Sequence, residues 1–314
     1  MKTLIIGAAG FVGGYLIDHL AKAYNWEIHA TKLPHEVLSP SAAMIHDLDI
    51  LDPAAVSDLL LKLKPDYIFH LAAQSSVALS WSKPALTVDI NIKGTLNILD
   101  SIRSIPDYSP RVLLIGSGEE YGYIRPEETP VHEGVTPRPG NIYAATKACQ
   151  NMLGSIYTKA YDMQLIMVRA FNHIGPNQAP IFVVSDFCKQ VAEIEAGLKE
   201  PVMHVGNLQA KRDFTDVRDI VRGYGMLIQT GHPGETYNIG SGHALSIQSL
   251  LDQILALSEA PIKVETDPNR LRPSDIPIIE ADVKKISDTT GWQPEIPIEK
   301  TLIETLNYWR EQLK

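Results

Sequence analysis

The sequence predicts an α/β protein: a doubly wound parallel sheet with a smaller α/β region interleaved with it. In the first half of the chain, strand-like apolar runs alternate with segments of helical periodicity. That order favours parallel strands joined by crossover helices. The chain opens with an apolar run, closely spaced glycines and a helical pattern. Past Phe171 the alternation weakens and Pro, Asn and Gly cluster, which indicates a second domain.

The individual elements follow from these patterns. The predicted strands are Thr3–Ile6, Glu27–Thr31, Met44–Leu48, Tyr67–Leu71, Val112–Ser117 and Leu165–Phe171. The predicted helices are Pro53–Leu63, Ala85–Ser104, Tyr143–Tyr161, Asp216–Gln229, Ile247–Leu257 and Pro297–Glu311. Ligands of such sheets bind at the carboxyl ends of the strands, so the residues that follow each strand are the candidates for a functional site.

The first candidate is the glycine turn after Thr3–Ile6. Glycines allow a tight turn and close approach to a pyrophosphate, and the following helix N-terminus supplies free N–H groups and a positive dipole. The sequence therefore predicts a dinucleotide site on a Rossmann-type sheet. Its spacing differs from the usual G-x-G-x-x-G, and a plain turn in another α/β protein stays an alternative. The predicted cofactor residues here are Gly7, Gly10, Phe11, Val12 and Gly13.

Composition limits the other classes of function. The chain has 314 residues, room for one or two domains, with 45% apolar and 21% charged residues. A net charge of −9 argues against a nucleic-acid binder, and no apolar run approaches membrane-spanning length. Cys149 and Cys188 form no metal or redox motif. We expect a cytoplasmic protein with no metal site, no nucleic-acid partner and no membrane partner.

The residues after the second predicted strand bear on the choice of cofactor. An NAD-selective site usually places Asp or Glu there to bind the ribose 2′-OH. This chain has Thr31 and Lys32, a hydroxyl and a cation that suit a 2′-phosphate better. NADP(H) is therefore favoured, with NAD(H) possible. The alternative for Lys32 is an exposed loop lysine without a ligand.

Two further strand ends supply cofactor candidates. After the third strand come Asp47 and Leu48, where the carboxylate could accept a hydrogen bond from an adenine amino group. After the fourth strand come Leu71, Ala72 and Ala73, a run whose small residues would let the backbone pass close to the cofactor. His70 at the end of this strand is better interpreted as a packed side chain than as a catalyst.

The fifth strand and the next helix carry the residues suited to chemistry. Tyr143 and Lys147 lie at i and i+4, so they share a helix face. An ammonium beside a phenol favours the phenolate, and we expect Lys147 to lower the pKa of Tyr143 toward that of an acid–base catalyst. Ser117 at a strand end could bind the substrate oxygen. A surface Tyr/Lys pair is the alternative, but it leaves the upstream glycine turn unexplained.

These residues together resemble the extended short-chain dehydrogenase/reductase family, in the branch that acts on sugar nucleotides. The resemblance covers nearly the whole chain and is greatest to the GDP-mannose 4,6-dehydratase group and its relatives, the GDP-4-keto-6-deoxy-D-mannose reductases. The motifs that carry it are Gly7-Ala-Ala-Gly10-Phe-Val-Gly13, Asp47-Leu48, His70-Leu-Ala-Ala-Gln74-Ser75, Asn91-Ile-Lys-Gly94-Thr95, Ser117 with Tyr143 and Lys147, Arg169-Ala-Phe-Asn172-His173-Ile-Gly175-Pro176, Gly206-Asn207-Leu-Gln-Ala-Lys211-Arg212-Asp213-Phe214 and Arg272-Pro273.

Two departures from the dehydratase pattern favour a reductase. The dehydratase motif resembles S-T-S-E-x-Y-G, whereas this chain has Gly116-Ser117-Gly118-Glu119-Glu120-Tyr121-Gly122. Dehydratases also tend to be longer and to carry an Arg pair where this chain has Thr31-Lys32. Glu119 leaves a second interpretation open, because in a dehydratase the acid at this position takes part in the elimination of water. It is therefore a candidate catalytic residue, whether vestigial, in contact with substrate, or active in a residual dehydration.

The resemblance implies a direct reduction. Hydride from NADPH would reach C4 of GDP-4-keto-6-deoxy-D-mannose, with Tyr143 as the acid, Ser117 on the carbonyl oxygen, and Lys147 on the nicotinamide ribose. The product would be GDP-D-rhamnose. The substrate residues implied are Gln74, Ser117, Asn172, Lys211, Arg212 and Arg272, of which the arginines suit a diphosphate. For Arg212 the alternative is a salt bridge to Asp213 or Asp216.

The predicted domain division is 1–171 plus 216–242 for the cofactor domain and 172–215 plus 243–314 for the nucleotide-sugar domain. The resemblance also implies a homodimer formed through Ala85–Ser104 and Tyr143–Tyr161. Two alternatives to the reductase stay open at this point. One is a GDP-mannose 4,6-dehydratase or another nucleotide-sugar dehydratase or epimerase. The other is a non-enzymatic NADP-sensing regulator, although such sensors typically lose the Tyr/Lys pair.

Overall fold

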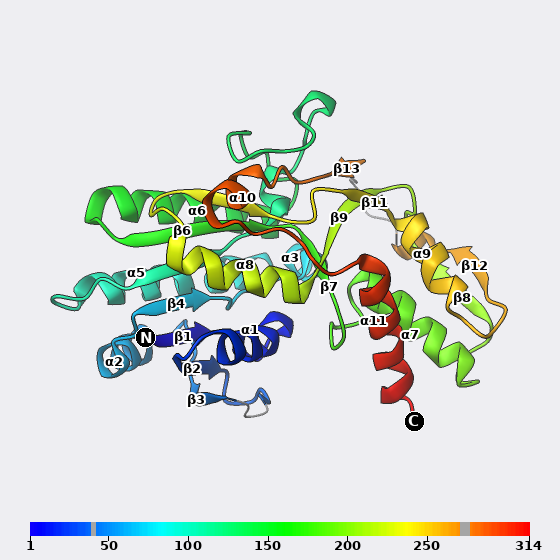
Figure 1. The fold of residues 1–314 in the computed structure, drawn as a ribbon, viewed down its shortest axis with the longest axis horizontal. Helices are drawn as coiled ribbons and strands as arrows, with labels where there is room; N and C mark the ends of the chain where they lie inside the picture. Colours follow the sequence, from blue (N-terminus) through cyan, green and yellow to red (C-terminus); the bar gives the residue numbers. More distant parts are fainter. Residues whose placement is uncertain (39–41, 271–276) are drawn as a thin grey trace.

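The predicted doubly wound α/β fold is confirmed by a computed structural model, which describes residues 1–38, 42–270 and 277–314. Seven parallel strands form the large sheet in the order β10-β6-β5-β4-β1-β2-β3 (Figure 1). Their bounds are β1 Lys2–Ile6, β2 Glu27–Lys32, β3 Ala43–Asp47, β4 Tyr67–His70, β5 Arg111–Ile115, β6 Gln164–Ala170 and β10 Thr236–Ile239. Of these strands, β10 has no counterpart among the predicted ones.

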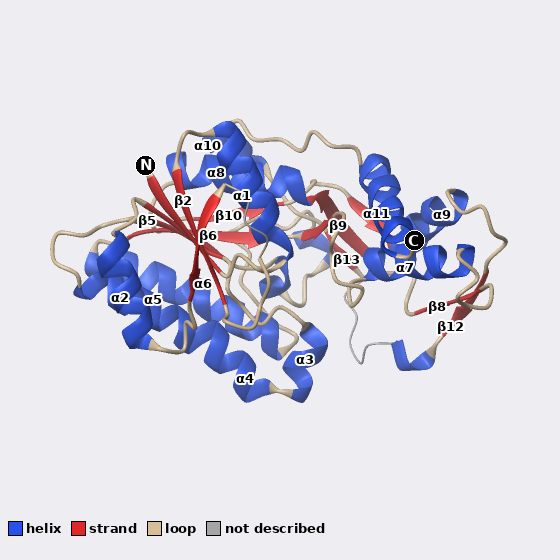
Figure 2. Cartoon of the chain, turned by 90° about the horizontal axis from the view of Figure 1, so that it is seen from below, coloured by secondary structure: helices blue, strands red, loops and turns tan. Residues whose placement is uncertain are grey.

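Helices cover both faces of this sheet, as the edge-on view in Figure 2 shows. On one face lie α1 (Phe11–Ala23), α8 (Val217–Thr230) and α10 (Lys284–Thr290). On the other face lie α2 (Pro53–Leu63), α5 (Gly94–Ser104) and α6 (Ile142–Tyr161), with the short α3 (Val77–Ser82) and α4 (Pro84–Val88) beside α6. The central strand β1 illustrates why both faces need cover. Its Ile5 packs under α1 and α8, whereas Leu4 and Ile6 pack under α2 and α5.

A second, smaller region is built from the later part of the chain. Its strands are β7 (Asn172–Ile174), β8 (Val202–Val205), β9 (Lys211–Asp216), β11 (Ala244–Ser246), β12 (Lys263–Thr266) and β13 (Ile278–Ile279). Its helices are α7 (Val183–Glu195), α9 (Ile247–Ala256) and α11 (Ile298–Gln312), which share an apolar core with β8 and β9. The sequence analysis did not predict α7 or these short strands, because the alternation of apolar runs and helical patterns is weak past Phe171.

One predicted helix is interrupted. The segment predicted as a single helix, Ala85–Ser104, consists of α4, a π-helical stretch Asp89–Lys93 and α5. Asn91 in the π-helical stretch is buried and accepts a hydrogen bond from Gln74 N at 2.8 Å. Its amide also donates to Thr146 Oγ1 on α6 at 2.9 Å, so the interruption joins the β4 strand end to the predicted catalytic helix.

The described chain also departs from the predicted domain boundaries at its C-terminal side. Residues 243–314 were assigned to the nucleotide-sugar domain, yet Ile286 and Trp292 lie in the core of the large sheet. Trp292 is fully buried and donates to the main-chain oxygen of Asp219 at the start of α8, at 2.9 Å. The chain returns to the large sheet because α10 packs against both α8 and β10 and covers apolar surface there. The rest of the division stays a prediction.

Candidate active site

Ser117, Tyr143 and Lys147 come together at the carboxyl end of β5. Ser117 follows this strand and caps the 3₁₀ turn Gly118–Tyr121, accepting from Glu119 N at 3.1 Å. Tyr143 and Lys147 stand on the first two turns of α6, whose N-terminus is capped by Asn141. All three side chains are buried, with Lys147 only 3% exposed. The three residues predicted to carry the chemistry therefore lie together at one strand end.

The electrostatics of Tyr143 differ from the prediction. Burial raises the pKa of Tyr143, and the hydrogen bond with Ser117 works against this rise, while Glu119 and Glu120 add to it. The predicted lowering by Lys147 is wrong for this arrangement, because the ammonium is engaged elsewhere. Lys147 Nζ donates to the main-chain oxygen of Ile115 at 2.7 Å and to Gln150 Oε1 at 3.0 Å.

Lys147 has a perturbed pKa of its own. Burial lowers the pKa of Lys147 to about 8, and the negative charge of Glu120 opposes this fall. Tyr143 and Lys147 therefore shift in opposite directions relative to their usual values. At neutral pH the site holds a protonated phenol beside an ammonium, which are the protonation states of a proton donor and its cationic neighbour.

The two acids next to Ser117 have different environments. Glu119 is partly buried and accepts from Asn141 Nδ2 at 3.2 Å, close enough to Tyr143 to raise the pKa of that phenol. Glu120 is fully buried, accepts from Ser117 N at 2.8 Å and from Arg169 Nε at 2.9 Å. Sequence reasoning missed Glu120. The available signal was Arg169, a charge inside a predicted buried strand, which requires a buried partner.

The glycine turn fits the phosphates of a dinucleotide. Gly7 has φ +84°, and a Cβ there would lie 2.5 Å from the main chain of Ala72. The N-terminus of α1 has no acid in its first turn and no side-chain cap, so its dipole faces no competing carboxylate from the helix itself. The residues present therefore suit a pyrophosphate on the turn 7–13, which includes Gly10, Phe11, Val12 and Gly13.

The two residues predicted to contact the ribose 2′-phosphate, Thr31 and Lys32, already have partners within the protein. Thr31 is buried and its hydroxyl accepts from Gly7 N at 3.1 Å, so this side chain supports the turn and does not face a 2′-phosphate. Lys32 Nζ pairs with Asp47 Oδ1 at 2.6 Å. The two predicted cofactor residues therefore lie together, and Leu48 N joins them by donating to the Lys32 main-chain oxygen at 2.8 Å.

The segment that follows β4 is hydrogen-bonded to the end of β1. Leu71 N and Ala72 N both donate to the Ile6 main-chain oxygen at 2.9 Å, which brings Leu71, Ala72 and Ala73 beside the glycine turn. His70 is packed, as predicted: it is buried, Nε2 lies 3.0 Å from Thr95 Oγ1, and burial lowers its pKa to about 3. Gln74 was predicted to contact substrate, but its amide bonds to Ser76 and Thr87 and so serves the fold.

Three of the predicted substrate residues lie on two paired strands of the smaller region. Asn172 begins β7 and is exposed, and β7 pairs with β9, which begins with Lys211 and Arg212. Arg212 Nη1 donates to the main-chain oxygen of Lys211 at 2.8 Å. The nearby Arg270 pairs with Asp186 at 2.5 Å. The predicted contact Arg272 lies outside the described residues.

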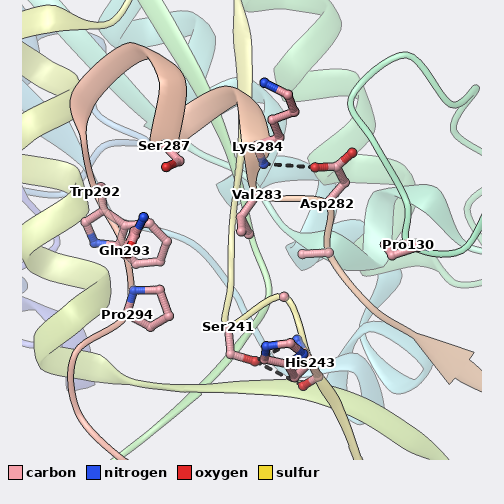
Figure 3. Close-up of a pocket in the computed structure, with 12 residues that line it drawn as sticks. Pro130, Ser241, His243, Asp282, Val283, Lys284, Ser287, Trp292, Gln293 and Pro294 are labelled. Atoms are coloured by element: carbon pink, nitrogen blue, oxygen red, sulfur yellow. Dashed lines mark hydrogen bonds between the residues drawn. The ribbon is translucent and has the colours of Figure 1, made fainter.

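A hollow of about 640 Å³ is lined by other residues (Figure 3). It lies between the Ser241–His243 turn and the segment around α10, and Trp292 forms part of its wall. None of the predicted site residues lines it. Neither a cluster of three or more metal-binding side chains nor a helix long and apolar enough to span a membrane occurs in the described part of the chain.

Comparisons with known proteins agree on one group of enzymes. A family model described as GDP-mannose 4,6 dehydratase matches residues 4–305. The chain is 32% identical to GDP-6-deoxy-D-mannose reductase of Pseudomonas aeruginosa, covering 100% of this chain and 98% of that protein. It is 28% identical to GDP-mannose 4,6-dehydratase of Vibrio cholerae, covering 96% of this chain and 92% of that protein.

Solved structures show the same likeness. The structure of RMD from Pseudomonas aeruginosa complexed with NADPH matches with a TM-score of 0.88 at 31% identity, covering 99% of this chain and 100% of that chain. UDP-glucose 4-epimerase of Thermus thermophilus in complex with NAD matches with a TM-score of 0.87 at 25% identity, covering 99% of each chain. Reductases, dehydratases and epimerases thus all resemble this chain along its length.

Proposed function

The chain belongs to the GDP-mannose 4,6-dehydratase family of NAD(P)-dependent nucleotide-sugar enzymes within the extended short-chain dehydrogenases/reductases, and on that premise we propose that it is a reductase. The proposed reaction converts GDP-4-keto-6-deoxy-D-mannose and NAD(P)H into GDP-D-rhamnose. The observation that carries the proposal is the buried Ser117–Tyr143–Lys147 group at the carboxyl end of β5.

Tyr143 is the proposed acid. Burial raises its pKa, so the phenol keeps its proton at neutral pH and can deliver it to the C4 oxygen as that oxygen gains negative charge. Ser117 lies close enough to Tyr143 to lower the pKa of that phenol, and it would share the same carbonyl oxygen as a second donor. Donors fixed in advance at the atom where charge develops give the main catalytic contribution.

Lys147 is the proposed positive neighbour of this pair. Its ammonium, on the Ile115 carbonyl oxygen, would hold the nicotinamide ribose and stabilise the negative charge that develops as Tyr143 gives up its proton. The bound nicotinamide supplies the hydride. Gly7, Gly10 and Gly13 with Phe11 and Val12 would hold the pyrophosphate, and Asp47, Leu48, Leu71, Ala72 and Ala73 would line the adenosine side.

Charge supports NADPH over NADH, with a qualification from Asp47. Lys32 is a cation where NAD-selective sites place an acid, but Asp47 pairs with it at 2.6 Å. Binding of a 2′-phosphate at Lys32 would therefore compete with this pair. We propose NADPH as the preferred cofactor and NADH as a usable one.

The nucleotide sugar would lie between the two regions of the fold. We propose that Arg212, Lys211 and Arg272 contact the diphosphate and that Asn172 contacts the sugar or diphosphate. Support comes from the pairing of β7 with β9, which places Asn172 in register with Phe214, two residues beyond Arg212. Arg270 is a weaker candidate, because Asp186 already neutralises it.

A dehydratase is the second candidate, and Glu119 favours it. This carboxylate lies near Tyr143, where an acid in the related dehydratases takes part in the loss of water. The serine at position 117, where the dehydratase motif has a threonine, favours the reductase. Stoichiometric NADPH consumption with the keto sugar, tested against conversion of GDP-mannose without net cofactor use, separates the two.

We also propose that the protein acts in the cytoplasm as a homodimer. Apolar side chains of α6 and the adjacent α4 are exposed, among them Met152, Ile156, Leu86 and Val88. Apolar groups gathered on one face favour a partner surface of the same kind. Sedimentation velocity on the wild type and on Ile156→Asp, with Leu198→Asp as an exposed apolar control remote from α6, tests the dimer.

A further inference from the structure

Three consecutive main-chain positions at the carboxyl end of β5, residues 115–117, are each held by a different element. The Ile115 oxygen accepts from Lys147 Nζ of α6 at 2.7 Å. Gly116 N donates to the Val168 oxygen of β6 at 2.7 Å. Ser117 N donates to the Glu120 carboxylate at 2.8 Å. The main chain that carries the Ser117 hydroxyl is therefore fixed from three sides, and Glu120 supplies the final contact.

The Glu120 carboxylate is itself anchored by a buried ion pair. Its second oxygen accepts from Arg169 Nε at 2.9 Å, and neither side chain is more than 6% exposed. Arg169 also donates to the main-chain oxygen of Glu133 at 3.3 Å and lies 4.6 Å from the centre of the Tyr121 ring. A buried ion pair contributes little net stability compared with an apolar pair of the same volume. A role in the site accounts for the charge better than stability does.

The glycine before Ser117 is required by this carboxylate. A Cβ on Gly116 would collide with Glu120 Oε1 and would lie 2.5 Å from the Val168 oxygen. Any larger residue at position 116 would displace either the carboxylate from Ser117 N or the strand end from β6. The absence of a side chain at Gly116 therefore leaves room for the Glu120 carboxylate to reach Ser117 N.

Glu120 also acts on Lys147 through its charge. Burial raises the pKa of Glu120 to about 7, so its carboxylate is charged at the pH where Lys147 titrates. There the negative charge favours the ammonium form of Lys147 and opposes the effect of burial. The other groups that face this part of the site are His70 on β4, whose lowered pKa keeps it neutral, and the protonated phenol of Tyr143 on α6. Arg169 of β6 pairs with Glu120, and Glu119 acts on Tyr143.

We propose that Glu120, anchored by Arg169, is a positioning residue of this active site. Its carboxylate fixes Ser117 through the main-chain N–H, and its charge keeps the Lys147 ammonium protonated. The catalytic meaning of the proposal rests on the proposed function, because Ser117 and Lys147 act in that reaction. The link between Glu120 and Lys147 does not depend on any substrate and can be measured without one.

The titration of Lys147 tests this link directly. Protein carrying ¹³Cε-lysine would be titrated by NMR, with the Lys147 signal assigned from its absence in Lys147→Arg. Glu120→Gln keeps an acceptor for Ser117 N–H but removes the charge, and we expect the Lys147 midpoint to fall by roughly one pH unit. Glu119→Gln is the matched control, for which we expect no change. An unchanged midpoint in Glu120→Gln overturns the proposal.

A second variant guards against misfolding, since Glu120→Gln leaves Arg169 buried without its counter-charge. The double variant Glu120→Leu/Arg169→Met removes both charges and the acceptor for Ser117 N–H. We expect the same fall of the Lys147 midpoint. At pH 7.5, where the wild-type Glu120 is charged, we expect a kcat about ten- to a hundredfold below that of the wild type with little change in NADPH affinity. A wild-type kcat in this variant overturns the role in fixing Ser117. If the wild type shows no turnover, the proposed function fails while the titration still decides the link.

Discussion

The ammonium of Lys147 donates a hydrogen bond to the main-chain oxygen of Ile115 at 2.7 Å. This bond joins helix α6 to the end of strand β5 and directs the lysine to the strand end that precedes Ser117. Tyr143, one turn earlier on α6, remains under the influence of burial, which raises its pKa. The two residues therefore meet in the protonation states that a reduction needs: a neutral phenol and a cation.

This relationship predicts the pH dependence of turnover. Lys147 has a pKa of about 8, below its usual value, and is protonated below that pH. Tyr143 keeps its proton to higher pH, because burial raises its pKa. With both protons needed, kcat should be about half its maximum near pH 8 and should fall about tenfold per pH unit above that. A falling limb placed instead near pH 10 would show that Lys147 does not control it.

Replacing Tyr143 with Phe removes the proposed acid while keeping the ring. We expect kcat to fall by about 10²- to 10⁴-fold, because general acid catalysis contributes on that order, with NADPH affinity barely changed. Steady-state rates and fluorescence titration of NADPH measure the two effects. Persistent turnover in this variant would remove the acid assignment. A wild type that binds NADPH but turns over no substrate would point to the sensor alternative.

Gly116→Ala tests the close packing beneath Ser117. Its methyl group would collide with Glu120 Oε1 and the Val168 oxygen, so we expect a loss of about 1–3 kcal/mol in the free energy of unfolding, with reduced kcat. Gly14→Ala is the matched control, since its methyl group meets nothing within 4 Å on helix α1. The control should be stabilised by about 1 kcal/mol through helix propensity. Urea unfolding of both variants compares them; a Gly116→Ala protein as stable as the wild type contradicts the packing.

Lys32→Ala tests the choice of cofactor. If Lys32 leaves Asp47 to bind the 2′-phosphate, the variant should bind NADPH about tenfold more weakly and bind NADH almost unchanged, since one charge-assisted contact is lost. Parallel titrations with the two cofactors measure the difference. Equal losses for both, or none for either, would mean that the lysine serves only its ion pair with Asp47.

Much of the architecture could be predicted because its signals are local. Alternating apolar runs and helical periodicity predict the parallel sheet, and strand ends in such a sheet share one edge, so Ser117 and the Tyr143–Lys147 helix could be expected to meet. The seventh strand, Thr236–Ile239, and helix Val183–Glu195 carry weaker patterns and were missed.

The missed features depend on contacts between residues distant in sequence. The direction of the Lys147 ammonium is set by Ile115, 32 positions away, so i, i+4 spacing alone misjudged its effect on Tyr143. Glu120 is buried by Arg169, 49 positions away, and nothing local distinguishes it from Glu119. Lys32 and Asp47 were each assigned a ligand, whereas the parallel pairing of β2 and β3 makes them neighbours.

The most direct test of the central claim is a two-substrate comparison with purified protein. GDP-4-keto-6-deoxy-D-mannose and GDP-mannose would be incubated separately with NADPH, with NADPH followed by absorbance and the sugar products by NMR. The reductase account predicts one NADPH consumed per keto sugar, GDP-D-rhamnose as product, and no reaction of GDP-mannose. Conversion of GDP-mannose to the keto sugar without net NADPH consumption, together with no reduction of the keto sugar, would contradict it and favour the dehydratase.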